Sequence, residues 1–131
     1  MPRLLRRGLA CMALLLAAGA QAQTIRSEQH AYTVSRLVSG LSHPWSVAFL
    51  PDGRLLITER DGRLRIAKDR HLDPQPVAGI PQVAAQGQGG LMDVVLHPDF
   101  TRNGLVYLSY SARGPDGSGT EVARGRLVGN R

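Results

Sequence analysis

Short apolar runs separated by turn residues dominate the chain after residue 36. The run 47–50 is apolar at every position, which predicts a strand buried on both faces. The run 63–66 alternates basic and apolar residues, which predicts a strand with one solvated face. A further strand is expected at 121–128, and no segment in this region shows helical periodicity. The pattern therefore predicts an all-β fold.

The strands form a repeat in which an apolar run, a Pro-Asp turn and a second apolar run follow one another. Pro51 opens the turn of the first unit, and Pro98 occupies the same place 47 residues later. Sheet repeats of roughly 40 to 50 residues are typical of β-propeller blades. Hairpin turns are expected at Asp52-Gly53, Asp61-Gly62, Asn103-Gly104 and Asp116-Gly117.

These units predict about one and a half blades of a partial β-propeller. A propeller needs about four to eight blades to close its ring. We therefore expect the chain to be a truncated N-terminal fragment, with apolar surface and strand edges left open on its second unit.

The first 22 residues have the features of a secretory signal peptide. A basic start containing Arg3, Arg6 and Arg7 precedes the apolar run 8–20, and small residues then form an A-x-A site ending at Ala22. The run is shorter than the roughly 20 residues that span a bilayer. We expect cleavage after Ala22, a lead-in at 23–36 and a truncated propeller domain at 37–131. The product would be periplasmic or secreted, without a membrane anchor.

Charge and histidine spacing exclude two classes of function. The formal net charge is +6, but basic residues outside the leader are interleaved with acids, so no nucleic-acid surface is expected. The four histidines lack metal-ligand spacing, and His97 is expected to cap a turn. Trp45, the single tryptophan, is expected to fill the core. Cys11, the single cysteine, lies in the leader and allows no internal disulfide.

The Gly-rich stretch from Gln86 to Asp93 is the candidate binding segment. Gln88 carries both a donor and an acceptor, which suits a sugar hydroxyl. From the residues alone, the favoured interpretation is a plain Gly-rich connector whose glutamine caps loop backbone groups. Asp93 could face a central channel, although holding a neighbouring backbone amide is the simpler interpretation.

The motifs at 43–53, 56–60, 86–93, 96–100 and 106–110 occur together in one order. They read HPWSVAFLPDG, LITER, QGQGGLMD, LHPDF and VYLSY. In this order and spacing they resemble the glucose/sorbosone dehydrogenase family, over about residues 37–127. That family includes the soluble aldose sugar dehydrogenases that depend on pyrroloquinoline quinone (PQQ).

The resemblance implies a six-bladed propeller that holds PQQ and calcium on its channel face and oxidises an aldose to a lactone. It implies that Gln88 contacts the sugar. The family's catalytic histidine and its PQQ and calcium ligands match no position here, so no catalytic, cofactor or metal residue is assigned. The fragment is expected to be inactive alone. A non-catalytic ligand- or protein-binding propeller is the alternative, and a propeller lactonase is a third option.

Overall fold

The computed structural model describes residues 23–130, which fall into two units divided between Arg36 and Leu37. The expected signal peptide, residues 1–22, lies outside the described residues. The first unit contains the hairpin of β1 (Gln23–Arg26) and β2 (Ala31–Val34). The amide of Ser27 closes this hairpin by donating to the carbonyl of His30 at 2.9 Å.

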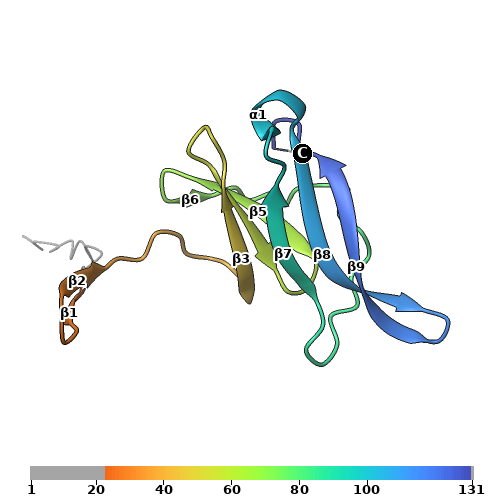
Figure 1. Ribbon diagram of the computed structural model, residues 1–131, viewed down its shortest axis with the longest axis horizontal. Helices are drawn as coiled ribbons and strands as arrows, with labels where there is room; N and C mark the ends of the chain where they lie inside the picture. Colours follow the sequence, from red (N-terminus) through yellow and green to blue (C-terminus); the bar gives the residue numbers. More distant parts are fainter. Residues whose placement is uncertain (1–22, 131) are drawn as a thin grey trace, which may run out of the picture. The chain divides into compact units, whose positions relative to one another are not determined.

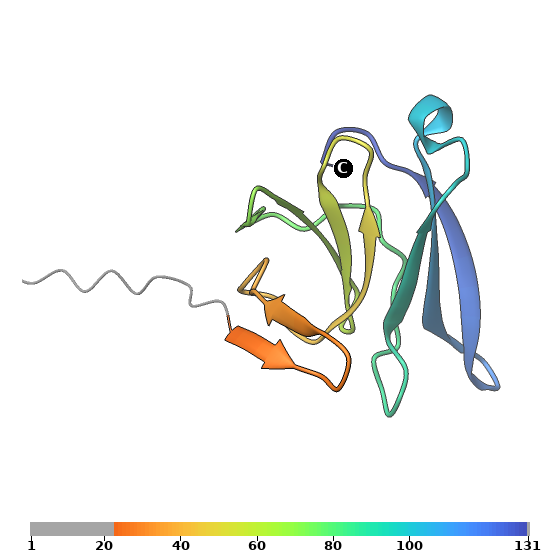
Figure 2. The same cartoon turned by 60° about the vertical axis from the view of Figure 1, so that its left-hand side comes forward.

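The second unit contains two antiparallel sheets that pack face to face (Figures 1 and 2). The first sheet has the order β3 (Pro44–Phe49), β4 (Leu55–Glu59), β5 (Arg63–Lys68) and β6 (His71–Leu72). The second has the order β7 (Leu91–Leu96), β8 (Leu105–Gly114) and β9 (Gly117–Arg126). One helical turn, α1 (Phe100–Asn103), joins β7 to β8. Within residues 23–130, no helix is both long and apolar enough to cross a membrane.

Three of the four predicted hairpin turns are confirmed, whereas Asn103-Gly104 forms the C-terminal end of helix α1 between β7 and β8. Gly53, Gly62, Gly104 and Gly117 have φ angles of +83°, +102°, +63° and +135°. L-residues with side chains rarely adopt these angles, so glycine at these positions lets each chain reversal occur without strain. The strand expected at 121–128 lies within β9.

One hydrophobic core lies between the two sheets. Strands β3 and β4 both contact β7, and the fully buried Leu56 and Leu91 come from opposite sheets. The buried members of this core are Leu50, Leu56, Leu64, Ile66, Val77, Leu91, Val94, Val106, Leu108 and Tyr110. The sheets are therefore held together by apolar packing, which is the driving force expected for a chain without disulfides.

The prediction that both faces of 47–50 are buried is wrong. Ala48 packs against the core and Leu50 belongs to it, but Val47 and Phe49 are 48% and 72% exposed. Trp45, expected in the core, is 54% exposed on the same strand. Successive side chains on a strand point to opposite faces, and the second sheet covers only one face of β3.

The 47-residue repeat is also present in the backbone geometry. The pairing register shifts between Pro44 and Val47 in the first sheet and between Leu91 and Val94 in the second. Each shift is a β-bulge at the start of the innermost strand, 47 residues apart in sequence. The two sheets are therefore structural repeats, and they are arranged as neighbouring blades.

A hydroxyl group replaces part of the interrupted hydrogen bonding at each bulge. Thr58 Oγ1 accepts from the amide of Ser46 at 3.0 Å, and Ser109 Oγ accepts from the amide of Asp93 at 3.0 Å. The Thr58 hydroxyl also donates to the Met92 carbonyl at 2.6 Å, which links the two sheets directly.

Candidate functional site

The turn that carries Gln88 immediately precedes β7, at the end of the sheets opposite α1 (Figure 1). Gly87 has a φ of +55°, and the Gly89 amide closes the turn by donating to the Gln86 carbonyl at 2.8 Å. The Gln88 side chain is exposed. Within the part of the chain that the structure describes, its amide makes no hydrogen bond. The interpretation in which Gln88 caps the loop is therefore wrong for this geometry.

Two glycines let this turn lie close against its neighbours. A Cβ on Gly89 would lie 2.7 Å from Ser111 Oγ, and a Cβ on Gly90 would lie 2.5 Å from the Arg60 carbonyl oxygen. Both separations are too short for real side chains. The two glycines are thus required by packing against the two sheets, whereas Gln88 between Gly87 and Gly89 faces solvent.

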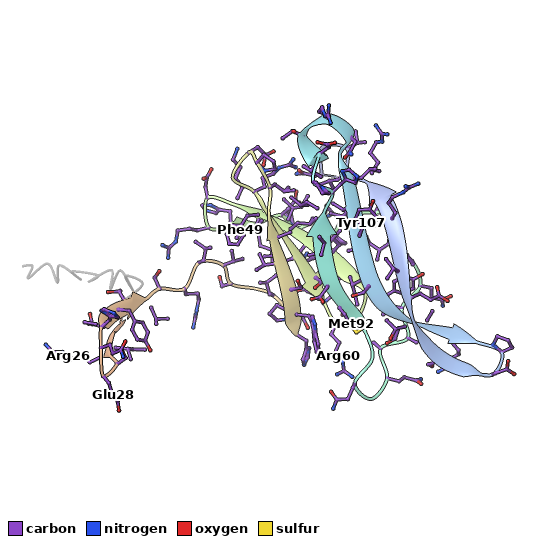
Figure 3. All side chains as sticks on the ribbon, viewed as in Figure 1. Arg26, Glu28, Phe49, Arg60, Met92 and Tyr107 are labelled. Atoms are coloured by element: carbon purple, nitrogen blue, oxygen red, sulfur yellow. The ribbon has the colours of Figure 1, made fainter. Side chains whose placement is uncertain are left out.

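Other side chains satisfy the backbone groups of the turn. Ser111 Oγ accepts from the Gly90 amide at 3.3 Å, and the Arg60 guanidinium donates to the carbonyls of Gly87 and Gly89. Figure 3 shows Arg60 at the end of the sheets where this loop lies. Neither residue was identified from the sequence as part of the candidate site, because their partners are backbone atoms, which leave no side-chain motif.

A fully buried carboxylate, that of Glu59, lies one residue before Arg60 in the chain. Glu59 Oε1 accepts from the Ser42 amide at 2.5 Å, and Oε2 accepts from Arg63 Nε at 2.7 Å and Arg65 Nη1 at 3.3 Å. Burial alone would raise the pKa of Glu59, but the Ser42 amide and the two guanidinium groups outweigh it and lower that pKa. The charged Glu59 side chain therefore holds the segment at Ser42 that leads into β3.

This cluster corrects the prediction of a solvated face on 63–66. The Arg65 side chain is only 11% exposed, because it faces Glu59 and donates through Nη2 to the Asp73 carbonyl at 2.9 Å. Arg63 is 39% exposed and also pairs with Asp61. Alternation of basic and apolar residues predicts a solvated face, but the two basic positions instead surround the buried Glu59 carboxylate.

Asp93 does not behave as the simpler interpretation expected. Its side chain is exposed, and its carboxylate makes no hydrogen bond or ion pair within residues 23–130. His97, by contrast, does serve a turn: its Nδ1 accepts from the Asp99 amide at 3.0 Å, and its ring stacks on Tyr107. Among residues 23–130, no three His, Cys, Asp or Glu side chains are grouped so that they could hold a metal ion.

A cavity of about 760 Å³ adjoins the Gln86 end of the turn. Its polar lining includes Gln82, Gln86 and Arg113. The Tyr110 hydroxyl donates to Glu121 Oε2 at 2.8 Å in the same lining, and this hydrogen bond, with burial, raises the pKa of Tyr110. The candidate site is thus an exposed amide on a fixed turn, with a polar cavity beside it.

Comparison with known proteins gives a consistent result. The family model described as Glucose / Sorbosone dehydrogenase matches residues 41–131. The aldose sugar dehydrogenase YliI of Escherichia coli is 50% identical over 96 residues, covering 72% of this chain and 26% of that protein. The quinoprotein glucose dehydrogenase B of Acinetobacter calcoaceticus is 26% identical over 95 residues, covering 70% of this chain and 20% of that protein. The Hedgehog-interacting protein of Mus musculus is 31% identical over 86 residues, covering 60% of this chain and 12% of that protein.

Solved structures give the same fold. The apo-form of the soluble aldose sugar dehydrogenase of Escherichia coli aligns with a TM-score of 0.64 and 52% identity, covering 67% of this chain and 26% of that one. The PQQ-bound aldose sugar dehydrogenase of Streptomyces coelicolor aligns with a TM-score of 0.60 and 23% identity, covering 82% and 28%. The predicted β-propeller architecture is thereby confirmed. The chain spans about a quarter of the length of these dehydrogenases.

Proposed function

Since the chain belongs to the glucose/sorbosone dehydrogenase family, we propose that it is the N-terminal part of an exported, PQQ-dependent sugar dehydrogenase that oxidises aldoses to lactones. Residues 1–22 would be the signal peptide, 23–36 the lead-in and 37–131 the first propeller blades. The observation that carries the proposal is Gln88, whose amide is exposed and unbonded on a turn that neighbouring residues hold in place.

The proposed role of Gln88 is to bind and orient the sugar. An amide side chain can donate to one hydroxyl and accept from another, which fixes both the position and the rotation of a sugar ring. Hydrogen bonds that are present in both the bound sugar and the transition state lower the KM for the sugar and leave kcat little changed. The chain's contribution would therefore be substrate positioning.

PQQ and calcium, in this proposal, are held mainly by residues of other blades. PQQ carries carboxylates that need cationic partners, but Arg60 is bonded to turn carbonyls, and Arg63 and Arg65 are bonded to Glu59. PQQ supplies the two-electron oxidation when it is bound, and its ligands, calcium and the base would have to come from other blades.

A chimaera tests the assignment directly. Residues 41–131 of this chain would replace the matching segment of the Escherichia coli aldose sugar dehydrogenase, which is 50% identical. We expect PQQ-dependent, dye-linked oxidation of aldoses by the chimaera and no turnover by the 131-residue chain alone. A folded but inactive chimaera would contradict the first expectation, and turnover by the pure 131-residue chain would contradict the second.

A single substitution in the chimaera tests the site residue. Gln88→Ala is expected to raise the KM for the aldose at least tenfold, because two hydrogen bonds to the sugar are lost. Gln82→Ala, in the neighbouring cavity, is the matched control and is expected to change KM less than twofold. An unchanged KM in Gln88→Ala would remove Gln88 from the site.

Export has its own test. If residues 1–22 are a signal peptide, the mature protein begins at Gln23, and mass spectrometry of the periplasmic fraction will show that end. A protein that retains Met1 after expression in a Gram-negative host would refute this part of the proposal.

A non-catalytic binding propeller is the second candidate, since a relative of this chain is named for its interaction with Hedgehog. The reading frame after codon 131 distinguishes the two candidates. Later blades with a channel-facing histidine and a group of basic residues would support the dehydrogenase. Blades that lack them would support the binding protein.

A further inference from the structure

We propose that Arg60 is the positioning residue for Gln88, fixing from the first blade a turn that belongs to the second. The functional part of this inference rests on the proposed role of Gln88 in sugar binding. The structural part, that Arg60 determines the conformation of the turn, stands independently of it.

The guanidinium of Arg60 binds the turn on both sides of Gln88. Its Nε donates to the Gly89 carbonyl at 3.1 Å, and its Nη2 donates to the Gly87 carbonyl. These two carbonyls belong to the residues immediately before and after Gln88. With both of them bonded to one rigid planar group, the backbone at Gln88 cannot rotate without breaking a charge-assisted hydrogen bond.

The backbone of Arg60 is fixed as firmly as its side chain. Its carbonyl accepts from the Leu91 amide at 2.9 Å, where β7 begins, and its amide donates to the His43 carbonyl at 3.1 Å. Gly90 lies so close to Arg60 that a Cβ there would be 2.6 Å from Arg60 Cγ. The next residue toward the N-terminus, Glu59, is the buried carboxylate that holds Ser42. Arg60 therefore connects the entry to β3 with the entry to β7.

Arginine is specifically suited to this task. Its donors lie in one plane at fixed separation, so a single side chain can bind two carbonyls at once. Lysine keeps the positive charge and the aliphatic stem, but its ammonium group has no such fixed fork. Arg60→Lys therefore separates the effect of geometry from the effect of charge.

Hydrogen exchange of the full 131-residue chain, followed by mass spectrometry, measures the effect on the turn. We expect Arg60→Lys to speed exchange about tenfold in peptides covering 86–91, the factor expected when a hydrogen bond to a charged group is lost. Exchange in β5 and β8 should stay within twofold of the parent chain. Arg102→Lys is the matched control, because Arg102 pairs with Asp99 on the exposed helical turn at the other end of β7.

Each outcome decides the proposal. Faster exchange confined to 86–91 supports it, and unchanged exchange there overturns it. Exchange that rises equally in all peptides would show that Arg60 stabilises the fold without a specific effect on the turn, and would also overturn it. Arg60→Met provides a second variant, in which the same local increase is expected without the charge.

A kinetic measurement in the chimaera described above tests the functional part. Arg60→Lys is expected to raise the KM for the aldose about tenfold and to leave kcat within threefold, because a displaced Gln88 weakens binding of the sugar. If kcat falls and KM is unchanged, Arg60 does not position Gln88 for sugar binding. If Gln88→Ala has no effect while exchange at 86–91 still responds to Arg60→Lys, the proposed function of Gln88 fails and the structural inference stands.

Discussion

Replacing Glu59 with glutamine removes a charge from a side chain that is fully buried and hydrogen-bonded to three donors. Glutamine has the same shape, so its oxygen can still accept from the Ser42 amide. Its NH₂ group would then face the guanidinium groups of Arg63 and Arg65, which are donors themselves. Arg65 loses the most stabilisation, because its side chain is only 11% exposed and its Nε already lacks a partner within the described residues.

The expected loss follows from these contacts. The hydrogen bond from the buried Arg65 is worth about 1.5–2 kcal/mol because its acceptor is charged. The pair with the half-exposed Arg63 adds about 0.5–1 kcal/mol, since solvent screens it. We therefore expect Glu59→Gln to lower the free energy of unfolding by about 2–3 kcal/mol at pH 7. For a unit of this size, that loss lowers Tm by about 10–20 °C.

The pH dependence provides the sharper test. The pKa of Glu59 is lowered in the fold from its ordinary value of 4.5, so the carboxylate stabilises the fold above that value. This contribution is lost as the pH falls through the lowered pKa. The difference between the parent chain and Glu59→Gln should be complete at pH 7 and should shrink at pH values well below 4.5.

Urea unfolding at low protein concentration, followed by circular dichroism, will measure this difference. Asp99→Asn is the control, because Asp99 forms an exposed pair with Arg102 and should contribute less than about 0.5 kcal/mol. Equal unfolding midpoints for the parent and Glu59→Gln at pH 7 would refute the reasoning. A difference that is as large at pH 3 as at pH 7 would also refute it.

Three further predictions concern other parts of the second unit. Gly90→Ala should lower the free energy of unfolding by about 1–3 kcal/mol, because the new Cβ would collide with the Arg60 carbonyl oxygen. Gly119→Ala, whose Cβ meets nothing within 4 Å, should lower it by less than about 0.5 kcal/mol. Equal losses in urea unfolding would contradict the close approach at Gly90. The chain alone should self-associate through the exposed apolar face of β3. Phe49→Glu should therefore shift its sedimentation toward the monomer. A parent chain that is monomeric at all concentrations would exclude self-association through this face. The hydrogen bond to Glu121 raises the pKa of Tyr110, so ultraviolet absorbance should show this phenol titrating above pH 10. In Glu121→Gln the pKa of Tyr110 should move back toward 10, and an unchanged titration would disprove that cause.

Local sequence determined much of the fold. The Asp-Gly and Asn-Gly pairs specify chain reversal through glycine φ angles, and the 47-residue repeat predicts two equivalent sheets. The exposure of Phe49 could not be predicted, because a run that is apolar at every position does not reveal which face is covered. The burial of Glu59 could not be predicted either, since the Ser42 amide that it binds carries no residue-specific signal.

The candidate site was predictable to a lesser extent. The Gly-rich stretch and its place before an inner strand were read from the sequence, whereas the free amide of Gln88 became visible only from the geometry of the turn. Arg60 acts on carbonyl groups 27 and 29 residues away, so no spacing of side chains indicates its role. Gln88 as a sugar contact stays a prediction until the substitutions above are measured.

The paired hydroxyls at the two bulges have a consequence for how further sheets could be added. The Thr58 hydroxyl bridges the two sheets, because it accepts a hydrogen bond from the Ser46 amide and donates one to the Met92 carbonyl. Ser109 has the same place in the second sheet and receives the Asp93 amide, but within residues 23–130 its own proton reaches no acceptor. A strand that presented a carbonyl near Ser109 Oγ could accept a hydrogen bond from it, as the Met92 carbonyl accepts one from Thr58. Ser109 therefore occupies in the second sheet the position from which Thr58, in the first sheet, bonds to its neighbour.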